Sequence, residues 1–148
     1  GPQDTWTRFA MSIFRLNGEI VRIGEQIVRP VGQSAARWQV LGRVCLQPQT
    51  VADLARDIGH ERQSVQRVAD ALLDDGLLVN RAHPTDKRTQ LLGATRKGQQ
   101  VMGSIYQQQV AWSQEVMTKL NPAQMETLIE TLQSIANVLE LEYQETPA

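Results

Sequence analysis

The sequence predicts a mainly helical protein that carries one short β-hairpin, and three observations support this fold class. Long segments near both ends of the chain place apolar residues three or four positions apart, the spacing of one helix face. Two short apolar runs between residues 77 and 94 flank a polar loop that contains proline, as in a hairpin. The chain has 148 residues, 41% hydrophobic and 21% charged, so it can bury the core of one compact domain or of two small interlocked lobes.

The first helix is expected to end where Pro30 and Gly32 interrupt it. Its apolar positions alternate between spacings of three and four, which is typical of the seam of a coiled coil. They are Trp6, Phe9, Ile13, Leu16, Ile20, Ile23 and Ile27. This seam and the apolar face of the final helix exceed what one subunit can cover, so the sequence predicts an obligate dimer.

Two helices are expected in the segment 34–58. Ser34 can cap the first of them, which Pro48 ends. Its inward face combines Ala35, Trp38, Leu41, Gly42 and Cys45. Thr50 and Asp53 have the spacing of a capping box, so a short helix should start there and run to about residue 58, where Gly59 turns the chain.

A further helix and a hairpin are expected in the segment 62–94. The helix covers about residues 62–75 and ends at Gly76, which suits a left-handed stop. Its inward stripe consists of Val65, Val68, Leu72 and Leu73. Residues 77–81 and 89–94 are expected to form two strands, joined by the loop 82–88.

Two long helices complete the prediction. Thr95 begins the first, which runs to about residue 120. Asn121 and Pro122 then restart the chain, because asparagine is a good N-cap and proline suits the first helical position. The last helix continues to near residue 143, and its apolar face contains Met125, Leu128, Ile129, Leu132, Ile135, Ala136 and Leu139.

The net charge of −1 is the sum over three segments whose own net charges differ. Residues 1–53 carry six basic and four acidic side chains, and residues 54–114 carry eight and six. Residues 115–148 carry one and six, so the acidic excess lies at the C-terminal end. A total near zero therefore neither requires nor forbids a polyanionic partner, because phosphate is attracted by a local basic face.

Several classes of protein are excluded. No apolar run is long enough to span a membrane and no secretory signal is visible, while Gly1 and Pro2 look like a scar of tag cleavage. With one cysteine and two histidines, neither a disulfide nor a Cys/His metal site is expected, and no cofactor is implied. No nucleophile, base and acid form a catalytic motif, so an enzyme is not expected. These features favour a cytoplasmic protein.

The order short helix, glycine turn, helix and hairpin within residues 50–95 is that of a winged helix-turn-helix. Within it the sequence resembles the MarR family of bacterial transcription regulators. The resemblance lies in Asp53-Leu-Ala-Arg-Asp-Ile-Gly59, Arg62-Gln-Ser-Val-Gln-Arg67, Asp75-Gly-Leu-Leu-Val-Asn-Arg81, Asp86-Lys-Arg88 and Thr95-Arg-Lys-Gly98.

This resemblance implies a homodimer that binds a pseudo-palindromic DNA operator, and a repressor whose DNA affinity a small ligand or an oxidant lowers. It also implies a division of the chain. Residues 34–95 would form the DNA-binding lobe, and residues 3–33 and 96–146 would form a helical dimerisation region.

The second helix of the predicted lobe has the shape to enter the major groove of double-stranded DNA. Its exposed face offers side chains that bond base edges, since glutamine pairs with adenine and arginine with guanine. The candidate DNA-binding residues on this helix are Arg62, Gln63, Ser64, Gln66 and Arg67. Ser64 can equally act as a cap or a phosphate contact.

The hairpin loop contains Asp86 and Arg88, which match the Asp-x-Arg wing motif of the family, in which the aspartate orients an arginine toward the minor groove. Arg81, His83 and Lys87 are further candidates for phosphate contact. The chain departs from the family pattern at His60, Glu61 and Ala94, and the negative Glu61 is expected to weaken DNA affinity or restrict sequence choice.

The resemblance also implies an effector pocket between the winged lobe and the dimerisation helices. An aromatic or phenolic ligand needs rings and a cation, and the residues of suitable type are Trp6, Arg15, Trp38, Arg43, His60 and Trp112. Each tryptophan can equally belong to the core, because all three fall on apolar helical stripes. Cys45 raises the alternative of a redox-sensing regulator, although its apolar stripe favours an inert thiol.

A second alternative is a winged-helix module that binds protein and not DNA, because a fold does not fix a function. The near-neutral charge favours this alternative, and the Asp86-Lys-Arg88 wing opposes it. The sequence leaves open the operator, the regulated genes, the effector and the sense of regulation.

Overall fold

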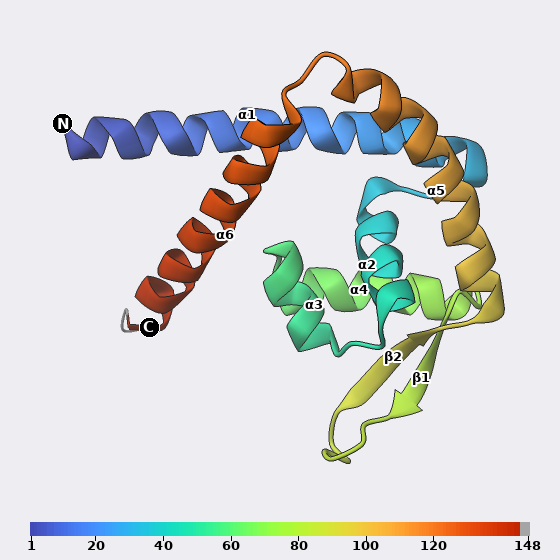
Figure 1. Ribbon diagram of the computed structural model, residues 1–148. Coiled ribbons are helices and arrows are strands. Elements are labelled where there is room, and N and C mark those ends of the chain that lie inside the picture. Colours follow the sequence, from blue (N-terminus) through green and yellow to red (C-terminus); the bar gives the residue numbers. More distant parts are fainter. Residues whose placement is uncertain (146–148) are drawn as a thin grey trace. The chain divides into compact units, whose positions relative to one another are not determined.

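The computed structural model describes residues 1–145 and is mainly helical, with a single antiparallel pair of strands in that part of the chain (Figure 1). The elements are α1 (Pro2–Val28), a 3-10 turn (Arg29–Val31), α2 (Ala35–Leu46), α3 (Val51–Ile58), α4 (Arg62–Asp74), β1 (Leu78–Ala82), β2 (Gln90–Ala94), α5 (Arg96–Met117) and α6 (Pro122–Glu145). This confirms the predicted fold class and the predicted order of elements. Residue 146, the last of the predicted dimerisation region, lies outside the described residues.

Local hydrogen bonds begin the helices where the sequence predicts. Ser34 Oγ accepts the backbone N–H of Arg37 at 3.2 Å, and Thr50 Oγ1 accepts that of Asp53 at 3.1 Å. Asn121 Oδ1 likewise accepts the N–H of Gln124 at 3.1 Å. Side-chain caps therefore fix the starts of α2, α3 and α6.

Several boundaries differ from the sequence prediction by one to three residues. The strands begin one residue later than expected, at Leu78 and Gln90. Helix α5 stops at Met117, short of residue 120, because the backbone N–H groups of Thr118 and Lys119 donate to carbonyls three residues back. These tighter bonds end the α-helical pattern before Asn121.

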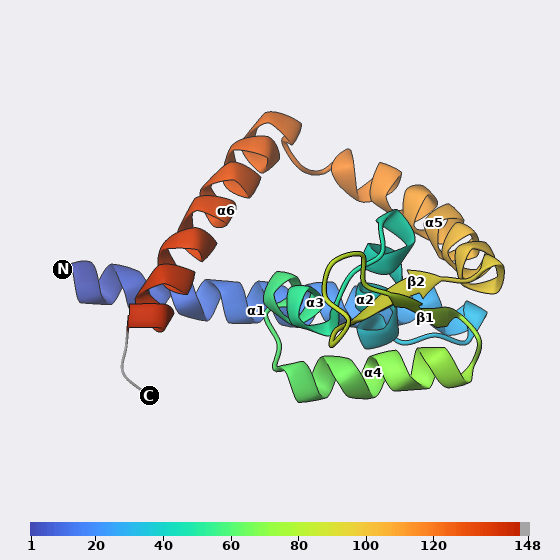
Figure 2. The same ribbon diagram turned by 90° about the horizontal axis from the view of Figure 1, so that it is seen from below.

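The chain divides into two compact units, with the boundary inside α5 between Gln109 and Val110. The core of the first unit joins α2, α3, α4 and the base of the hairpin. It contains Val40, Leu41, Val44, Leu54, Ala55, Val65, Ala69, Leu72, Leu77, Leu78 and Leu92. Figure 2 shows α4 along one side of this unit, with α3 and the hairpin beside it.

Glycines make the turns on both sides of α4. Gly59 has φ of 79° between α3 and α4, and Gly76 has φ of 73° between α4 and β1. Both values lie in the left-handed region, as predicted for helix stops. The short turn at Gly59 sets α3 and α4 in contact as a helix-turn-helix.

The base of the hairpin is fixed on two sides. β1 pairs with β2 in the register Leu78 with Ala94 and Arg81 with Leu91. Leu92 also exchanges two backbone hydrogen bonds with Gln49, at 3.1 and 2.8 Å, on the linker between α2 and α3. From this base the hairpin extends away from α2, α3 and α4 (Figure 1).

The second unit buries little of its own apolar surface. None of the described side chains of α6 is buried, and Leu128, Ile129 and Leu139 are each more than two-fifths exposed. Helix α1, in the first unit, buries only Gly24 and Val28.

Candidate nucleic-acid interface

The predicted recognition residues all lie on the exposed face of α4. Val65, Ala69 and Leu72 face the core, and the helical period turns the polar positions on the opposite face outward. Arg62, Gln63, Ser64, Gln66 and Arg67 are all exposed. Gln66 Nε2 donates to Asp70 Oδ1 at 2.8 Å, one turn further along the helix, which orients its amide.

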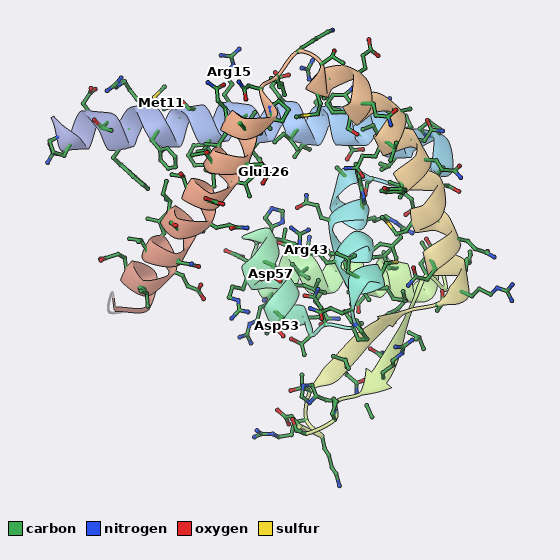
Figure 3. All side chains as sticks on the ribbon, viewed as in Figure 1. Met11, Arg15, Arg43, Asp53, Asp57 and Glu126 are labelled. Atoms are coloured by element: carbon green, nitrogen blue, oxygen red, sulfur yellow. The ribbon has the colours of Figure 1, made fainter. Side chains whose placement is uncertain are left out.

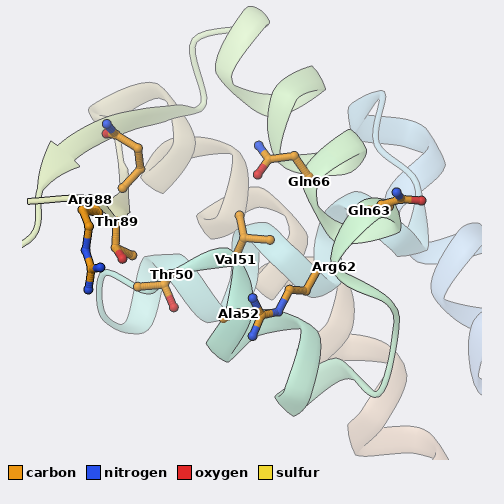
Figure 4. A pocket seen from close by; sticks show the side chains of 9 residues that line it. Thr50, Val51, Ala52, Arg62, Gln63, Gln66, Arg88 and Thr89 are labelled. Atoms are coloured by element: carbon orange, nitrogen blue, oxygen red, sulfur yellow. The ribbon is translucent and has the colours of Figure 1, made fainter. Parts of the chain in front are cut away.

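A concavity of about 430 Å³ brings the start of α3, the start of α4 and the hairpin together (Figure 4). Three predicted recognition residues line it, namely Arg62, Gln63 and Gln66. Arg88 lines its other side, so the guanidinium groups of Arg62 and Arg88 border the same groove as the amides on α4. Ser64 and Arg67 are not among its lining residues.

Sequence reasoning did not assign Thr50, Val51, Ala52, Thr89 and Gln90 to this groove, yet they line it too. The capping role of Thr50 was predictable from its spacing to Asp53. Its place beside the wing depends on how α3 packs, which no local pattern encodes. On α3, the Arg56 guanidinium lies 3.9 Å from Oδ1 of Asp53 and 3.9 Å from Oδ1 of Asp57. Both aspartates are labelled in Figure 3.

The wing loop is organised by Asp86. Its Oδ1 accepts the backbone N–H of Arg88 at 3.0 Å and the Nε–H of the same residue at 3.3 Å, while its Oδ2 accepts the hydroxyl of Thr89 at 3.0 Å. Donation from the Arg88 backbone, then from Thr89 and the Arg88 side chain, holds the pKa of Asp86 below its usual value. The side chain of Arg88 is 91% exposed, so its guanidinium points into solvent from a fixed base.

The other wing candidates differ in exposure. Lys87 is exposed. Arg81 is exposed but folds back over the hairpin, where its Nη2 donates to the carbonyl of Ala94 at 3.4 Å. A side chain at Gly93 would overlap the Arg81 guanidinium, so the glycine provides the space for it. His83 is half-buried and turns its Nδ1 inward to the loop.

The predicted effector residues do not form one cluster. Trp38 and Arg43 line a cavity of about 450 Å³ between α1, α2 and α5, within the first unit. Its other polar side chains are Asn17 and Gln39. His60 lines a separate cavity of about 240 Å³, together with Ser64 of α4.

The remaining predicted effector residues lie apart from the larger cavity. Trp6 and Arg15 belong to α1 but not to its lining, and Arg15 projects from the side of α1 opposite to α2 (Figure 3). Trp112 lies on the part of α5 that belongs to the second unit. The three predicted tryptophans therefore occupy three different surroundings.

Cys45 has the surroundings of an unreactive thiol. It is partly buried, and its Sγ lies 3.9 Å from the carbonyl oxygen of Gly98. Loss of hydration on burial raises the pKa of Cys45 to about 11. Because the thiolate is the reactive form, this environment opposes redox sensing.

The described residues contain neither a membrane-spanning helix nor a metal-binding cluster. Between residues 1 and 145, no helix is long and apolar enough to cross a membrane. In the same part of the chain, no three side chains of histidine, cysteine, aspartate or glutamate gather as ligands for a metal ion.

Comparison with known proteins decides the family. Residues 32–89 match the model of the MarR family. An uncharacterized protein of Mycobacterium tuberculosis is 31% identical over 139 residues, which cover 94% of this chain and 97% of that relative. The chain belongs to the MarR family. It is therefore a DNA-binding transcriptional regulator and not an enzyme.

Solved structures share the MarR fold. A mutant of E. coli MarR complexed with operator DNA has a TM-score of 0.73 at 22% identity, covering 86% of this chain and 93% of that one. CouR of Rhodococcus jostii RHA1, bound to p-coumaroyl-CoA, has a TM-score of 0.77 at 22% identity, covering 86% and 91%. The helices and wing of this MarR-family chain thus follow an architecture found in both proteins.

Proposed function

We propose that the protein is a homodimeric repressor that binds a pseudo-palindromic operator through α4 and the wing, and that a small aromatic ligand releases it. Within each half-site, α4 enters the major groove and Arg88 reaches the adjacent minor groove. The dimerisation region consists of α1, α6 and the part of α5 beyond the lobe.

The observation that carries this proposal is the groove that Arg62, Gln63, Gln66 and Arg88 border together. Amide and guanidinium groups on α4 can bond the edges of adenine and guanine. Arg88 extends from a turn that Asp86 holds, which suits insertion between two phosphate strands. Base reading and backbone binding would then occur on one continuous surface.

The exposed apolar surface supports the homodimer. Phe14 on α1 is 76% exposed and Leu141 on α6 is 60% exposed. Such side chains recur along both helices, and a second copy of the chain supplies the same apolar surface in a symmetric arrangement.

The cavity beside Trp38 supports a small aromatic ligand. Its volume of about 450 Å³ falls in the range of pockets that hold small molecules. The Arg43 guanidinium offers a partner for a carboxylate or phenolate, and Trp38 offers a ring for stacking. Gly42 also lines this cavity, and a Cβ there would lie within van der Waals contact of both Trp38 and Met102.

The DNA assignment is tested by selection of random duplexes with the purified protein, followed by titration of the enriched site at two salt concentrations. An inverted repeat with half-sites about one helical turn apart supports it. Affinity should also fall steeply with salt, as expected for several phosphate contacts. Absence of enrichment would contradict sequence-specific reading and would favour the winged-helix module that binds protein.

The ligand assignment is tested with p-coumarate and p-coumaroyl-CoA as probes, added to the complex with the selected duplex. Release of DNA by either probe, lost in Trp38→Ala and Arg43→Ala but retained in Trp112→Phe, supports the cavity. Release that all three variants retain would place the site elsewhere. Retention of DNA at saturating concentrations of both probes would contradict an aromatic effector of this class.

A further inference from the structure

His83 lies in the wing loop and accepts hydrogen bonds through one ring nitrogen. Its Nδ1 receives the backbone N–H of Thr85 at 3.2 Å and that of Asp86 at 3.0 Å, and the hydroxyl oxygen of Thr85 lies 3.5 Å from the same nitrogen. Nδ1 has a single lone pair, which the two amides share. The half-buried imidazole therefore stands in for the side-chain oxygen that usually closes such a turn.

This arrangement requires a neutral imidazole with its proton on Nε2. An imidazolium carries N–H groups at both nitrogens and accepts no hydrogen bond. Protonation of Nδ1 would direct a third N–H at the amides of Thr85 and Asp86. The ring would then have to rotate, or the turn would have to open.

The same turn determines where Arg88 stands. The backbone N–H of Asp86 is held by His83, and the carboxylate of Asp86 holds both the backbone and the Nε of Arg88. A continuous chain of hydrogen bonds thus runs from the imidazole through Asp86 to the exposed guanidinium. Loss of its first link would remove the bond on the Asp86 backbone and leave the position of Arg88 to the bonds of the Asp86 carboxylate.

The ionisable groups around the imidazole come from the hairpin itself. The Asp86 carboxylate attracts a charged imidazole. Lys87 and Arg88 are exposed cations of the same loop and oppose that charge. Arg81 of β1 bonds the carbonyl of Ala94 and is directed along the hairpin.

We propose that His83 is a positioning residue of the wing, which presents Arg88 to DNA when its imidazole is neutral and weakens DNA binding when it is protonated. The inference depends on the proposed contact between the wing and DNA. The predicted loss of DNA affinity on protonation distinguishes this role from a phosphate contact, because a histidine that only contacted phosphate would bind DNA more tightly once it was charged. Measurements between about pH 8 and pH 5.5 cover the range in which histidine side chains ordinarily change charge.

The first experiment needs no DNA. NMR of the free protein at about pH 8 should show His83 with its proton on Nε2. On acidification, the amide protons of Thr85 and Asp86 should shift together with the imidazole signals. In His83→Asn, whose side-chain oxygen accepts hydrogen bonds without titrating, these amide shifts should vanish. A proton on Nδ1 at high pH, or amide shifts that persist in His83→Asn, would overturn the proposal.

The second experiment measures DNA affinity against pH for the wild type and three variants. Between about pH 8 and pH 5.5, wild-type affinity should fall about fivefold more than that of His83→Asn, a size expected for one or two exposed hydrogen bonds. His83→Ala should bind weakly at both pH values, and His83→Asn should restore binding at both. His60→Asn removes the other histidine of the chain and measures how much of the wild-type pH profile that residue contributes.

Two outcomes of the second experiment overturn the proposal. Parallel pH profiles of wild type and His83→Asn would show that the imidazole does not control the wing. A relative gain of wild-type affinity on acidification would make His83 a phosphate contact. An unchanged affinity of Arg88→Ala would overturn the wing contact and the DNA part of the inference, whatever the NMR experiment shows about the turn.

Discussion

Arg37 Nη2 lies 2.6 Å from Asp75 Oδ2, and this ion pair ties the first turn of α2 to the residue that follows α4. The Nε of Arg37 also donates to Gln33 Oε1 at 2.8 Å. On the other side, Lys97 Nζ donates to the carbonyl of Asp75 at 2.9 Å. The end of α4 is therefore joined to both α2 and α5, which also border the cavity at Trp38.

The first prediction concerns this ion pair. Arg37→Ala and Asp75→Ala should each lower the free energy of unfolding by about 0.5–1 kcal/mol, since the pair is partly exposed to solvent. A double-mutant cycle in urea should show coupling that decreases with added salt. The Arg8 and Asp4 pair, whose side chains are 72% and 68% exposed, is the control and should show coupling near zero. Equal coupling in both pairs would contradict the structural role of Arg37.

The second prediction compares two glycines of α5. A side chain at Gly98 would overlap the carbonyl oxygen of Leu77, whereas one at Gly103 meets nothing within 4 Å. Gly98→Ala should therefore destabilise the fold by about 2 kcal/mol or more, through forced backbone movement. Gly103→Ala should be neutral or stabilise by up to about 1 kcal/mol, because alanine favours helix. Thermal and urea unfolding give both values, and similar effects at the two positions would contradict the close packing at Gly98.

The third prediction separates positioning from base reading. Arg88→Ala should weaken binding to every duplex and reduce the salt slope by about one unit, as for loss of one backbone contact. Arg67→Ala should instead relax the preference at one base pair per half-site by about 1–3 kcal/mol. Titration of the selected site and of single-base variants measures both effects. Arg8→Ala on α1 is the control for lost charge, and an effect equal to that of Arg88→Ala would argue against a specific wing contact.

The fourth prediction follows from the raised pKa of Cys45. At pH 8 a thiol with a pKa of about 11 is far less ionised than an ordinary cysteine. Alkylation by iodoacetamide should thus be about one hundredfold slower in the native protein than in the unfolded chain, and should accelerate as pH rises toward the pKa. Mass spectrometry of quenched samples gives the rates. Rapid modification of the native protein at pH 8 would reopen the redox alternative.

The fifth prediction addresses assembly. Light scattering at micromolar concentration should give twice the mass of the chain. Ile129→Glu, on the apolar face of α6, should lower that mass toward one chain, because it places charge in an apolar interface. Glu130→Gln, on the neighbouring polar face, should leave it unchanged. A wild-type monomer would contradict the proposed homodimer.

Much of the fold could be predicted because its signals are local. Ser34, Thr50 and Asn121 cap helices through bonds to residues three positions ahead, so their spacing alone reveals them. Gly59 and Gly76 adopt the left-handed conformation that stops a helix. The bridge between Gln49 and Leu92 was not predictable, since it joins residues far apart in sequence and has no hydrophobic period of its own.

Some features of the candidate site could likewise be predicted from local sequence, and others depend on long-range packing. The exposed positions of α4 follow from helical periodicity, and Trp38 and Arg43 lie on one helix, so their shared cavity needs little long-range information. The groove between Thr50 and Arg88 depends on packing across the lobe. The inward turn of His83 depends on two backbone amides, which side-chain chemistry alone does not reveal.

The bridge at Leu92 has a consequence for motion in the hairpin. An isolated pair of strands is barely stable in water, yet here the base is held by β1 on one side and by Gln49 on the other. The tip, between Ala82 and Gln90, is held by hydrogen bonds within the loop itself. The hairpin should therefore open from the tip inward, with amide exchange slowing progressively toward Leu92. Such a wing can adapt its tip, which carries Arg88, to different groove widths while its base stays fixed against Gln49.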